Sequence, residues 1–123
     1  VTDNLEKPNG IIGSLDGKTI YIADPKAKKV YKYEVNSNGT LLNKRLFVED
    51  LSVDGMSIDK NGNIYMASEK IVIYNPEGEL LFSVEVPERP TNVCFAGKDM
   101  KTLFITARTG VYALKMDTEG MPY

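Results

Sequence analysis

The sequence contains no histidine and only one cysteine, Cys94, among its 123 residues. The absence of histidine removes the commonest general base and the commonest metal ligand. Carboxylates, amides and backbone carbonyls remain, and these are the ligands of a hard cation such as calcium. A lone cysteine excludes an internal disulfide. Because Cys94 lies between Val93 and Phe95, we expect it to be a reduced core residue rather than a nucleophile.

The sequence also lacks a strong excess of one charge and any long apolar run. The formal net charge is −2 and the lysines are scattered among acidic residues, which argues against a nucleic-acid partner. No apolar stretch has membrane-spanning length, and the start shows no secretory signal pattern. Because the first residue is Val1 rather than methionine, we expect a cut upstream. A soluble protein of the cytoplasm or of the periplasm fits equally well.

What the sequence does contain is an internal repeat. Residues 8–11 (Pro-Asn-Gly-Ile) return as 53–56 (Val-Asp-Gly-Met) and, more weakly, as 90–93 (Pro-Thr-Asn-Val). Each copy precedes a β-branched and aromatic stretch that ends in alanine, at Ala23, Ala67 and Ala107. A spacing of roughly 40 residues is typical of repeat architectures.

Short β-branched and aromatic runs separated by glycine, asparagine and proline turns favour an all-β fold. The expected strands are 11–13, 19–23, 29–35 and 42–48 in the first repeat, 56–59, 63–67, 70–74 and 80–86 in the second, and 93–95, 102–107 and 110–116 in the third. Four antiparallel strands recurring at this spacing form a β-propeller blade. We therefore expect a partial propeller domain over 1–123, with blades at about 8–48, 53–86 and 90–116 and a tail at 117–123.

The number of blades is too small for a closed ring. Propellers have about four to eight blades, and roughly three alone would leave blade faces and strand edges uncovered. We therefore expect half of a larger propeller, whose other half is absent, a separate chain, or a second copy of this chain.

Several motifs resemble those of the SMP-30/gluconolactonase/LRE-like family. They are Asn9-Gly10 before an aliphatic strand, Asp16-Gly17-Lys18-Thr19, Asp54-Gly55-Met56, and the pattern from Thr91 to Ala107. Their order and spacing match the family from about residue 4 to residue 116. The resemblance implies a six-bladed propeller of which this chain would be the C-terminal half. It also implies a small-molecule lactone as substrate and one divalent cation, expected to be calcium, at the mouth of the central channel.

The resemblance also assigns roles to two residues. Asn9 would be a metal ligand, and Asp54 would be both a second ligand and the catalytic acid/base. A third ligand of the family, a glutamate of its first blade, has no counterpart in this chain, and the substrate-binding residues of the second and third blades are missing as well.

The repeat gives independent reasons to single out these positions. The hairpin turns between first and second strands are expected at 16–17 and 61–62, so Asn9 and Asp54, which precede the first strands, are not those turns. Ring closure would direct both side chains to one channel end, where water activated by Asp54 could attack a metal-polarised lactone carbonyl. At the equivalent place in the third repeat, Thr91 and Asn92 either line the channel or cap loop backbone. A non-catalytic propeller that binds a ligand or a protein remains the alternative function.

Other aspartates fit a structural role better than a chemical one. Asp16, Asp59 and Asp99 each begin a Gly- or Asn-containing turn or a short polar loop. We expect these three side chains to bond turn backbone rather than to bind metal.

Overall fold

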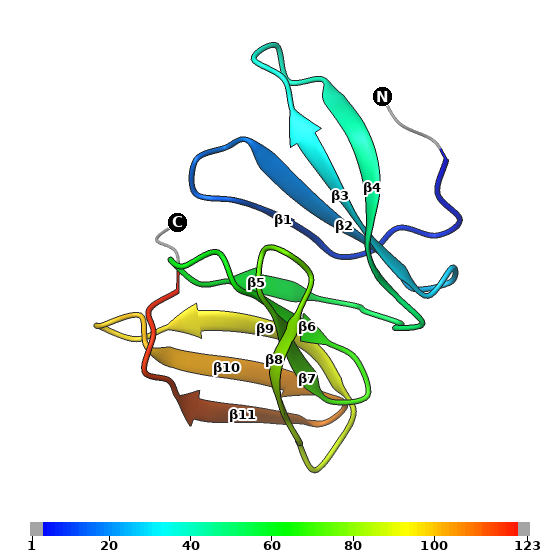
Figure 1. The fold of residues 1–123 in the computed structure, drawn as a ribbon. Coiled ribbons are helices and arrows are strands. Elements are labelled where there is room, and N and C mark those ends of the chain that lie inside the picture. The colour runs from blue at the N-terminus through cyan, green and yellow to red at the C-terminus, as the bar shows by residue number, and fades with distance from the viewer. Residues whose placement is uncertain (1–3, 121–123) are drawn as a thin grey trace.

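The computed structural model describes residues 4–120 and contains eleven β-strands, with no helix among those residues (Figure 1). The first sheet has the order β1-β2-β3-β4, with strands at Ile11–Gly13, Thr19–Asp24, Lys29–Val35 and Leu41–Glu49. The second has the order β5-β6-β7-β8, at Met56–Ile58, Ile64–Ala67, Ile71–Tyr74 and Leu80–Val84. The third has three strands in the order β9-β10-β11, at Pro90–Ala96, Thr102–Ala107 and Gly110–Lys115.

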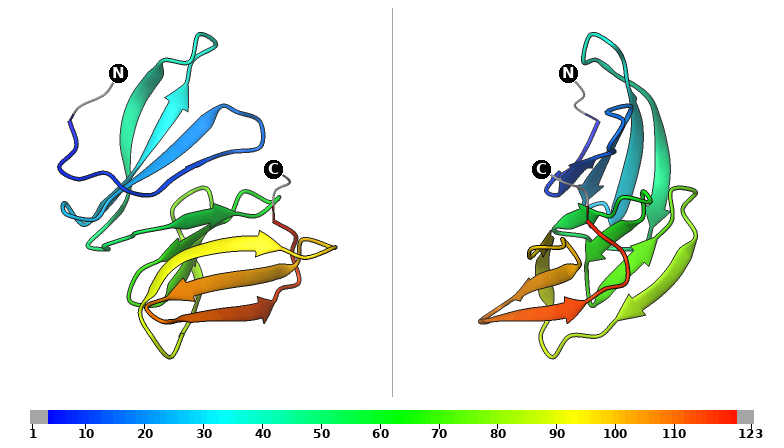
Figure 2. Two further views of the ribbon diagram at one scale, coloured as in Figure 1. Left: turned by 180° about the vertical axis from the view of Figure 1, so that it is seen from behind. Right: turned by 90° about the vertical axis from the view of Figure 1, so that its left-hand side faces the viewer.

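All strand pairs within the three sheets are antiparallel, as expected for propeller blades. The first strands of the sheets, β1, β5 and β9, contact one another in that order (Figure 1). The remaining strands of each sheet extend outward from this inner row, and the turned views show the sheets stacked face against face (Figure 2). The all-β propeller fold is therefore confirmed, with the first strand of each blade on the channel side.

The core consists of two apolar layers between neighbouring blades. Strand β6 supplies both, because its alternate residues point to opposite faces. Ile64 and Met66 belong to the layer shared with the first blade, whereas Tyr65 and Ala67 belong to the layer shared with the third. The middle strands of the second blade, β6 and β7, are thus covered on both sides, which explains why they are uniformly hydrophobic rather than alternating.

The outer face of the third blade is open. In β10, Leu103 and Ile105 are buried against the second blade, whereas Phe104 between them is 38% exposed. The same alternation in β9 buries Val93 and Phe95 and leaves Cys94 exposed. The expectation of a buried Cys94 was therefore wrong, because it treated a strand with period two as buried on both faces.

The segment after β11 packs back onto the second blade. Gly120 forms an isolated antiparallel bridge with Asp59, and the Lys60 amide donates to the Glu119 carbonyl at 2.9 Å. A Cβ atom at position 120 would lie 2.2 Å from the Cβ of Phe95, so only glycine fits there. The expected tail is therefore docked as far as residue 120, while residues 1–3 and 121–123 lie outside the described residues.

No helix that could cross a membrane is found in the described part of the chain.

Candidate functional site

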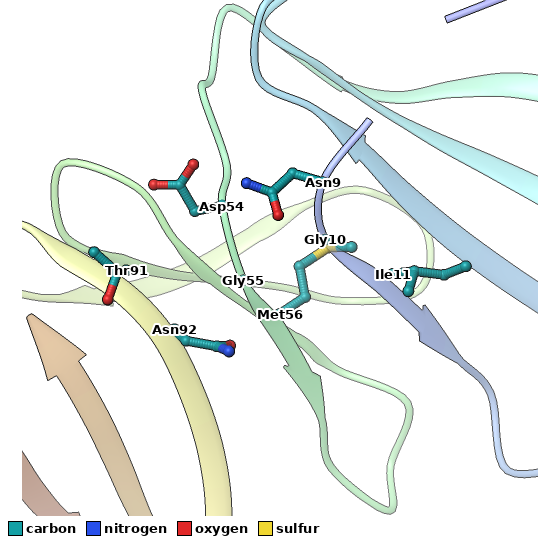
Figure 3. A pocket seen from close by; sticks show the side chains of 8 residues that line it. All are labelled: Asn9, Gly10, Ile11, Asp54, Gly55, Met56, Thr91 and Asn92. Atoms are coloured by element: carbon teal, nitrogen blue, oxygen red, sulfur yellow. The ribbon is translucent and has the colours of Figure 1, made fainter. Parts of the chain in front are cut away.

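The inner ends of the three blades surround an open depression of about 570 Å³. It contains every site residue expected from the sequence, together with two glycines and two apolar side chains. The lining residues are Asn9, Gly10, Ile11, Asp54, Gly55, Met56, Thr91 and Asn92 (Figure 3). Segments that are far apart in the sequence thus meet at one place, at the entry to β1, β5 and β9.

Asn9 and Asp54 occupy equivalent positions in the first two blades. The Asn9 amide donates to the Ala23 carbonyl at 2.9 Å, and the Ala23 amide donates to the Gly10 carbonyl at 2.8 Å. In the second blade, the Asp54 amide donates to Ala67 at 3.0 Å, and the Ala67 amide donates to Gly55 at 2.9 Å. The same backbone ladder therefore presents an amide in one blade and a carboxylate in the next.

The side chains of Asn9 and Asp54 are available for a ligand. Asn9 is exposed and Asp54 is half-buried, and both also line a second depression of about 470 Å³ on the side of Lys7 and Lys26. Within residues 4–120, no hydrogen bond or ion pair engages the side-chain amide of Asn9 or the carboxylate of Asp54. An acid and an amide without protein partners thus face the same space (Figure 3).

The glycine that follows each of these residues permits neighbouring blades to approach closely. A Cβ atom at Gly10 would lie 2.3 Å from the Asp54 carbonyl oxygen, and one at Gly55 would lie 2.1 Å from Oδ1 of Asn92. Real Cβ contacts are never this short, so a side chain at either position would push the inner strands apart. The repeat revealed these glycines, but their role depends on the blade-to-blade distance, which a single sequence does not contain.

Thr91 and Asn92 both line the depression, and both make local hydrogen bonds. The Thr91 hydroxyl lies 3.0 Å from the Thr106 hydroxyl and donates to the Thr106 carbonyl at 3.2 Å. Asn92 Oδ1 accepts from the Val93 amide at 2.9 Å. The two alternatives left open by the sequence are therefore compatible, because the residues bond backbone and border the depression at once.

The three aspartates expected in turns do bond turn backbone. A carboxylate oxygen of Asp16 accepts from the Lys18 amide at 2.9 Å. Asp59 accepts from Asn61 at 2.9 Å, and Asp99 accepts from Lys101 at 3.1 Å. Each is an Asx-type turn in which the side chain bonds the amide two residues ahead, so the structural interpretation is confirmed.

The side-chain oxygens at the depression are suitable ligands for a hard cation, but they are too few to complete its coordination. Across residues 4–120, no three histidine, cysteine, aspartate or glutamate side chains form a metal-binding group. Asp54 offers carboxylate oxygens and Asn9 offers a side-chain amide oxygen, and both kinds of oxygen are calcium ligands. Calcium takes about six to eight such ligands, which is more than these two side chains supply. The carboxylate of Asp54 and the side-chain oxygen of Asn9 therefore fit part of a calcium site.

Ile11 and Met56 are site-lining residues that the sequence did not single out for function. Each directly follows a motif glycine and lies in the first position of an inner strand. Their position directly after the repeated glycine could have identified them as site-lining residues, because the first side chain of an inner strand borders the channel.

Comparison with known proteins identifies related sequences and folds. Residues 1–109 match the profile described as the SMP-30/gluconolactonase/LRE-like region. A gluconolactonase of Zymomonas mobilis is 34% identical over 130 residues, which cover 94% of this chain and 36% of that protein. The structure of a gluconolactonase from Xanthomonas campestris superimposes with a TM-score of 0.83 at 26% identity, covering 93% of this chain and 39% of that one.

A structure of regucalcin, described as a calcium-binding protein, from Agrobacterium tumefaciens superimposes with a TM-score of 0.84 at 22% identity. The match covers 96% of this chain and 48% of that protein. The present chain therefore spans less than half the length of each of these three proteins.

Proposed function

Because the chain belongs to the SMP-30/gluconolactonase/LRE-like family, we propose that it forms the C-terminal half of a calcium-dependent lactone hydrolase, with Asn9 and Asp54 in its site. The related proteins described as gluconolactonases support a small-molecule lactone as the substrate class. The related protein described as calcium-binding supports calcium as the cation.

One observation of the structure carries this proposal. Among the aspartates of the blades, Asp24 and Asp59 are buried and accept hydrogen bonds from nearby backbone amides. Asp54 differs, because its carboxylate faces the depression beside Asn9 with no such partner. A carboxylate that bonds no part of the fold and lines a depression shared with an amide is a candidate ligand-binding group, and this supports the assignment of Asp54.

The proposed chemistry assigns a separate task to each side chain. Oxygens of Asp54 and Asn9 would hold calcium, which when bound polarises the lactone carbonyl and stabilises the negative charge that develops on it. The second oxygen of Asp54 takes a proton from the attacking water as the water oxygen bonds to the carbonyl carbon. When the ring C–O bond then breaks, the same carboxyl returns the proton to the leaving ring oxygen, and the product is a hydroxy acid.

Asn92 is proposed to orient the substrate. Its Oδ1 is engaged with the Val93 amide, so its amide nitrogen remains to donate to a ligand hydroxyl or carbonyl. Ile11 of β1 and Met56 of β5 add apolar surface to the lining of the depression. Thr91 borders the same space with a hydroxyl already bonded to Thr106.

The remaining ligands must be supplied by the other half of the ring. The missing portion of the parent protein would close the channel, and a second copy of this chain is the alternative source. The isolated chain is therefore expected to bind calcium weakly, in the range of about 0.1–1 mM, because calcium affinity falls when a site has few charged ligands and little rigidity.

Calcium titration followed by NMR tests the proposal directly. We expect calcium to shift the side-chain amide signals of Asn9 and the backbone amides of Asp54 and Gly55. The substitutions Asp54→Ala and Asn9→Ala should each weaken the apparent affinity by about tenfold or more. Asp16→Ala is the matched control, because it removes an exposed carboxylate from a turn at the far end of β1.

Two results would contradict the proposal. Absence of any calcium-dependent shift up to about 10 mM, well above the expected range, would remove the metal site. Equal affinity of the wild type and Asp54→Ala would show that calcium binds elsewhere. If either result is obtained, the non-catalytic binding propeller becomes the better description.

A further inference from the structure

The residue at the end of the second strand of a blade, directly after the repeated alanine, is polar and buried in the two blades that carry the proposed ligands. In the first blade it is Asp24, which is 1% exposed, and in the second it is Ser68, which is 2% exposed. Both directly follow an alanine, Ala23 or Ala67, whose backbone is paired with the loop that leads to Asn9 or Asp54. The two side chains are thus equivalent in position and different in chemistry.

Each of these side chains bonds the backbone two residues before a proposed ligand. The two carboxylate oxygens of Asp24 accept from the amides of Glu6 and Lys7, both at 2.8 Å, and Lys7 lies two residues before Asn9. The Ser68 hydroxyl donates to the Ser52 carbonyl at 2.7 Å, and Ser52 lies two residues before Asp54. An acceptor in one blade and a donor in the other therefore fix the same point of the loop.

The third blade has no such connection. The residue after Ala107 is Arg108, which is exposed and has a φ of 27°, and the adjoining hydroxyl of Thr91 bonds Thr106 of its own sheet. The buried polar side chain therefore occurs in the two blades that present Asn9 and Asp54 and is missing from the third blade, where Asn92 bonds the backbone amide of Val93.

We propose that Asp24 and Ser68 are positioning residues, which hold the loops before β1 and β5 and thereby aim Asn9 and Asp54 into the shared depression. The inference rests on the proposed function, because it concerns the residues assigned to the metal there. Neither Asp24 nor Ser68 lines that depression, so each acts only through the backbone of the loop that it holds.

The loops need this second attachment because the backbone ladder begins only at the ligand itself. In each blade the pairing with the second strand starts at Asn9 or Asp54 and continues into the inner strand. Without Asp24 the residues before Asn9 would have no strand to hold them, and Asn9 would become the frayed end of a ladder. The loop before Asp54 is also held by the Leu51 amide, which donates to the Lys28 carbonyl at 3.2 Å, and by the Ser52 hydroxyl, which donates to the Pro25 carbonyl at 3.2 Å, so the loss of Ser68 would loosen it less. Frayed ends open with little free-energy cost, and a metal ligand that fluctuates binds more weakly.

Amide hydrogen exchange of the full chain, followed by NMR, tests the inference without any ligand. In Asp24→Asn, which retains only one acceptor oxygen, we expect exchange at Glu6, Lys7 and Asn9 to accelerate about tenfold or more, while exchange at Asp54 is unchanged. In Ser68→Ala the pattern should reverse, with acceleration at Asp54 and none at Asn9. Ser68→Thr retains the hydroxyl and should restore the wild-type exchange rate at Asp54.

Two control substitutions separate positioning from general stability. Ser57→Ala removes a hydroxyl that is equally buried but lies within β5. Asp59→Asn alters a buried aspartate whose hydrogen-bond partners belong to the turn at the opposite end of the second blade. Both controls should leave the relative exchange rates of Asn9 and Asp54 unaltered. Uniform acceleration across all strands in the Asp24 and Ser68 variants would overturn the inference, because it would indicate a global effect.

A calcium titration of the same variants distinguishes this inference from the proposed function. If both hold, Asp24→Asn and Ser68→Ala reduce the apparent calcium affinity by about tenfold or more, the size of effect reported for residues that orient ligands. If the wild type binds no calcium, the proposed function fails, and the local exchange pattern alone decides whether the loops are held in this way. If affinity is unchanged despite accelerated exchange, positioning is refuted and the proposed function stands.

Discussion

Three aspartates of this chain have three different tasks. Asp24 holds a loop and Asp59 holds a turn, each through backbone amides, whereas Asp54 has no such partner and faces the depression. Position in the repeat was enough to separate Asp54 from Asp59 in the sequence. The task of Asp24 could not be predicted, because its partners Glu6 and Lys7 are distant in the sequence and show no pattern of their own.

Asp59 is expected to be the aspartate with the greatest effect on stability. It is completely buried, and it accepts from the amides of Asn61 and Asn63, the Asn63 side chain and the Tyr65 hydroxyl at 2.9–3.1 Å. Replacement by alanine leaves these donors without a partner, so Asp59→Ala should lower the free energy of unfolding by about 3 kcal/mol. Urea denaturation measures this change. Asp16→Ala, which removes an exposed turn aspartate, should cause a much smaller one, and equal effects would contradict the argument.

The Tyr65 hydroxyl contributes to this network as a donor. Burial, together with the negative charge of Asp59 and its hydrogen bond, raises the pKa of the Tyr65 hydroxyl well above its ordinary value. The hydroxyl therefore stays protonated throughout the neutral range and can donate to Asp59 at 3.0 Å. The blade thus pairs a buried acid with a donor that cannot become a second negative charge.

Gly10 is expected to resist substitution because of its neighbour across the blade interface. The methyl group of alanine would lie 2.3 Å from the Asp54 carbonyl oxygen, and relief of this clash must shift β1 or β5. Gly10→Ala should therefore destabilise the protein by about 1–3 kcal/mol and move the NMR signals of Asp54. Gly13→Ala is the matched control in the same strand, since its methyl group would have no contact shorter than 3.8 Å. If both variants are equally stable, the close approach has no energetic consequence.

At the scale of elements, turn chemistry made most of the strands predictable. The glycines of the two expected hairpin turns, Gly17 and Gly62, have positive φ angles of 72° and 86°, and Gly39 and Gly78, which lie between later strands, have similar values of 85° and 87°. Glycine adopts this conformation without strain. The expected strands at 29–35 and 102–107 have the same bounds in the structure. The register irregularities in the pairing of β3 and β4 were not predictable, because a bulge depends on how two strands fit rather than on either sequence.

The segment before β1 is expected to loosen in acid, because Asp24 holds it as a carboxylate. Burial alone would raise the pKa of this carboxyl, but hydrogen bonds from the amides of Glu6, Lys7 and Ala27 and the charge of Lys44 outweigh burial and lower it below 3.8. A lowered pKa in the folded state means that the stabilising contribution is present above the unfolded pKa of about 3.9. It is lost as the pH falls through the lower folded value.

The measurement is amide exchange at Glu6 and Lys7, corrected for intrinsic exchange, between pH 6 and pH 2.5. We expect protection to be constant above about pH 4 and to fall below it, while the amides of β6 remain protected. Asp24→Asn should show weaker protection that does not change with pH. Parallel loss of protection at β6 would show that acid unfolds the whole protein and would contradict a local role of Asp24.

At the scale of the whole molecule, the sequence predicted the blades but not their open faces. Strand β10 alternates between Leu103 and Ile105, which are buried, and Phe104, which is exposed, yet all three are apolar in the sequence. Which of them faces the second blade depends on how the third sheet is placed against it, and among residues 4–120 no further sheet covers the other side. The error at Cys94 has the same origin, since this residue lies beside Phe104 on the same face through the pairing of β9 with β10.

The open faces fit the pairing of two half-rings. The outer face of the third blade carries Phe104 and Val111, which are 38% and 70% exposed, and the channel side of the first blade carries Ile11, which is 59% exposed. In a pair of copies related by a two-fold axis, the third blade of each copy would contact the first blade of the other. The two contacts would be identical, and together they would close the ring. They would also bring two copies of Asn9 and Asp54 to one channel, which supplies oxygen ligands that a single chain lacks.

We therefore expect the isolated chain to associate with itself, and Cys94 provides a direct probe because it lies on the third-blade face. Sedimentation should show a dimer that dissociates on dilution, and the rate at which a thiol reagent modifies Cys94 should rise as the dimer dissociates. Phe104→Lys places a charge on the same face, so it should shift the equilibrium to monomer by about tenfold or more. Leu80→Lys changes an exposed residue of β8 in the second blade, which has no part in the proposed pairing, and should have no effect. A monomer at all concentrations, with Cys94 modified at one constant rate, would refute self-association and leave the rest of the parent protein as the source of the missing ligands.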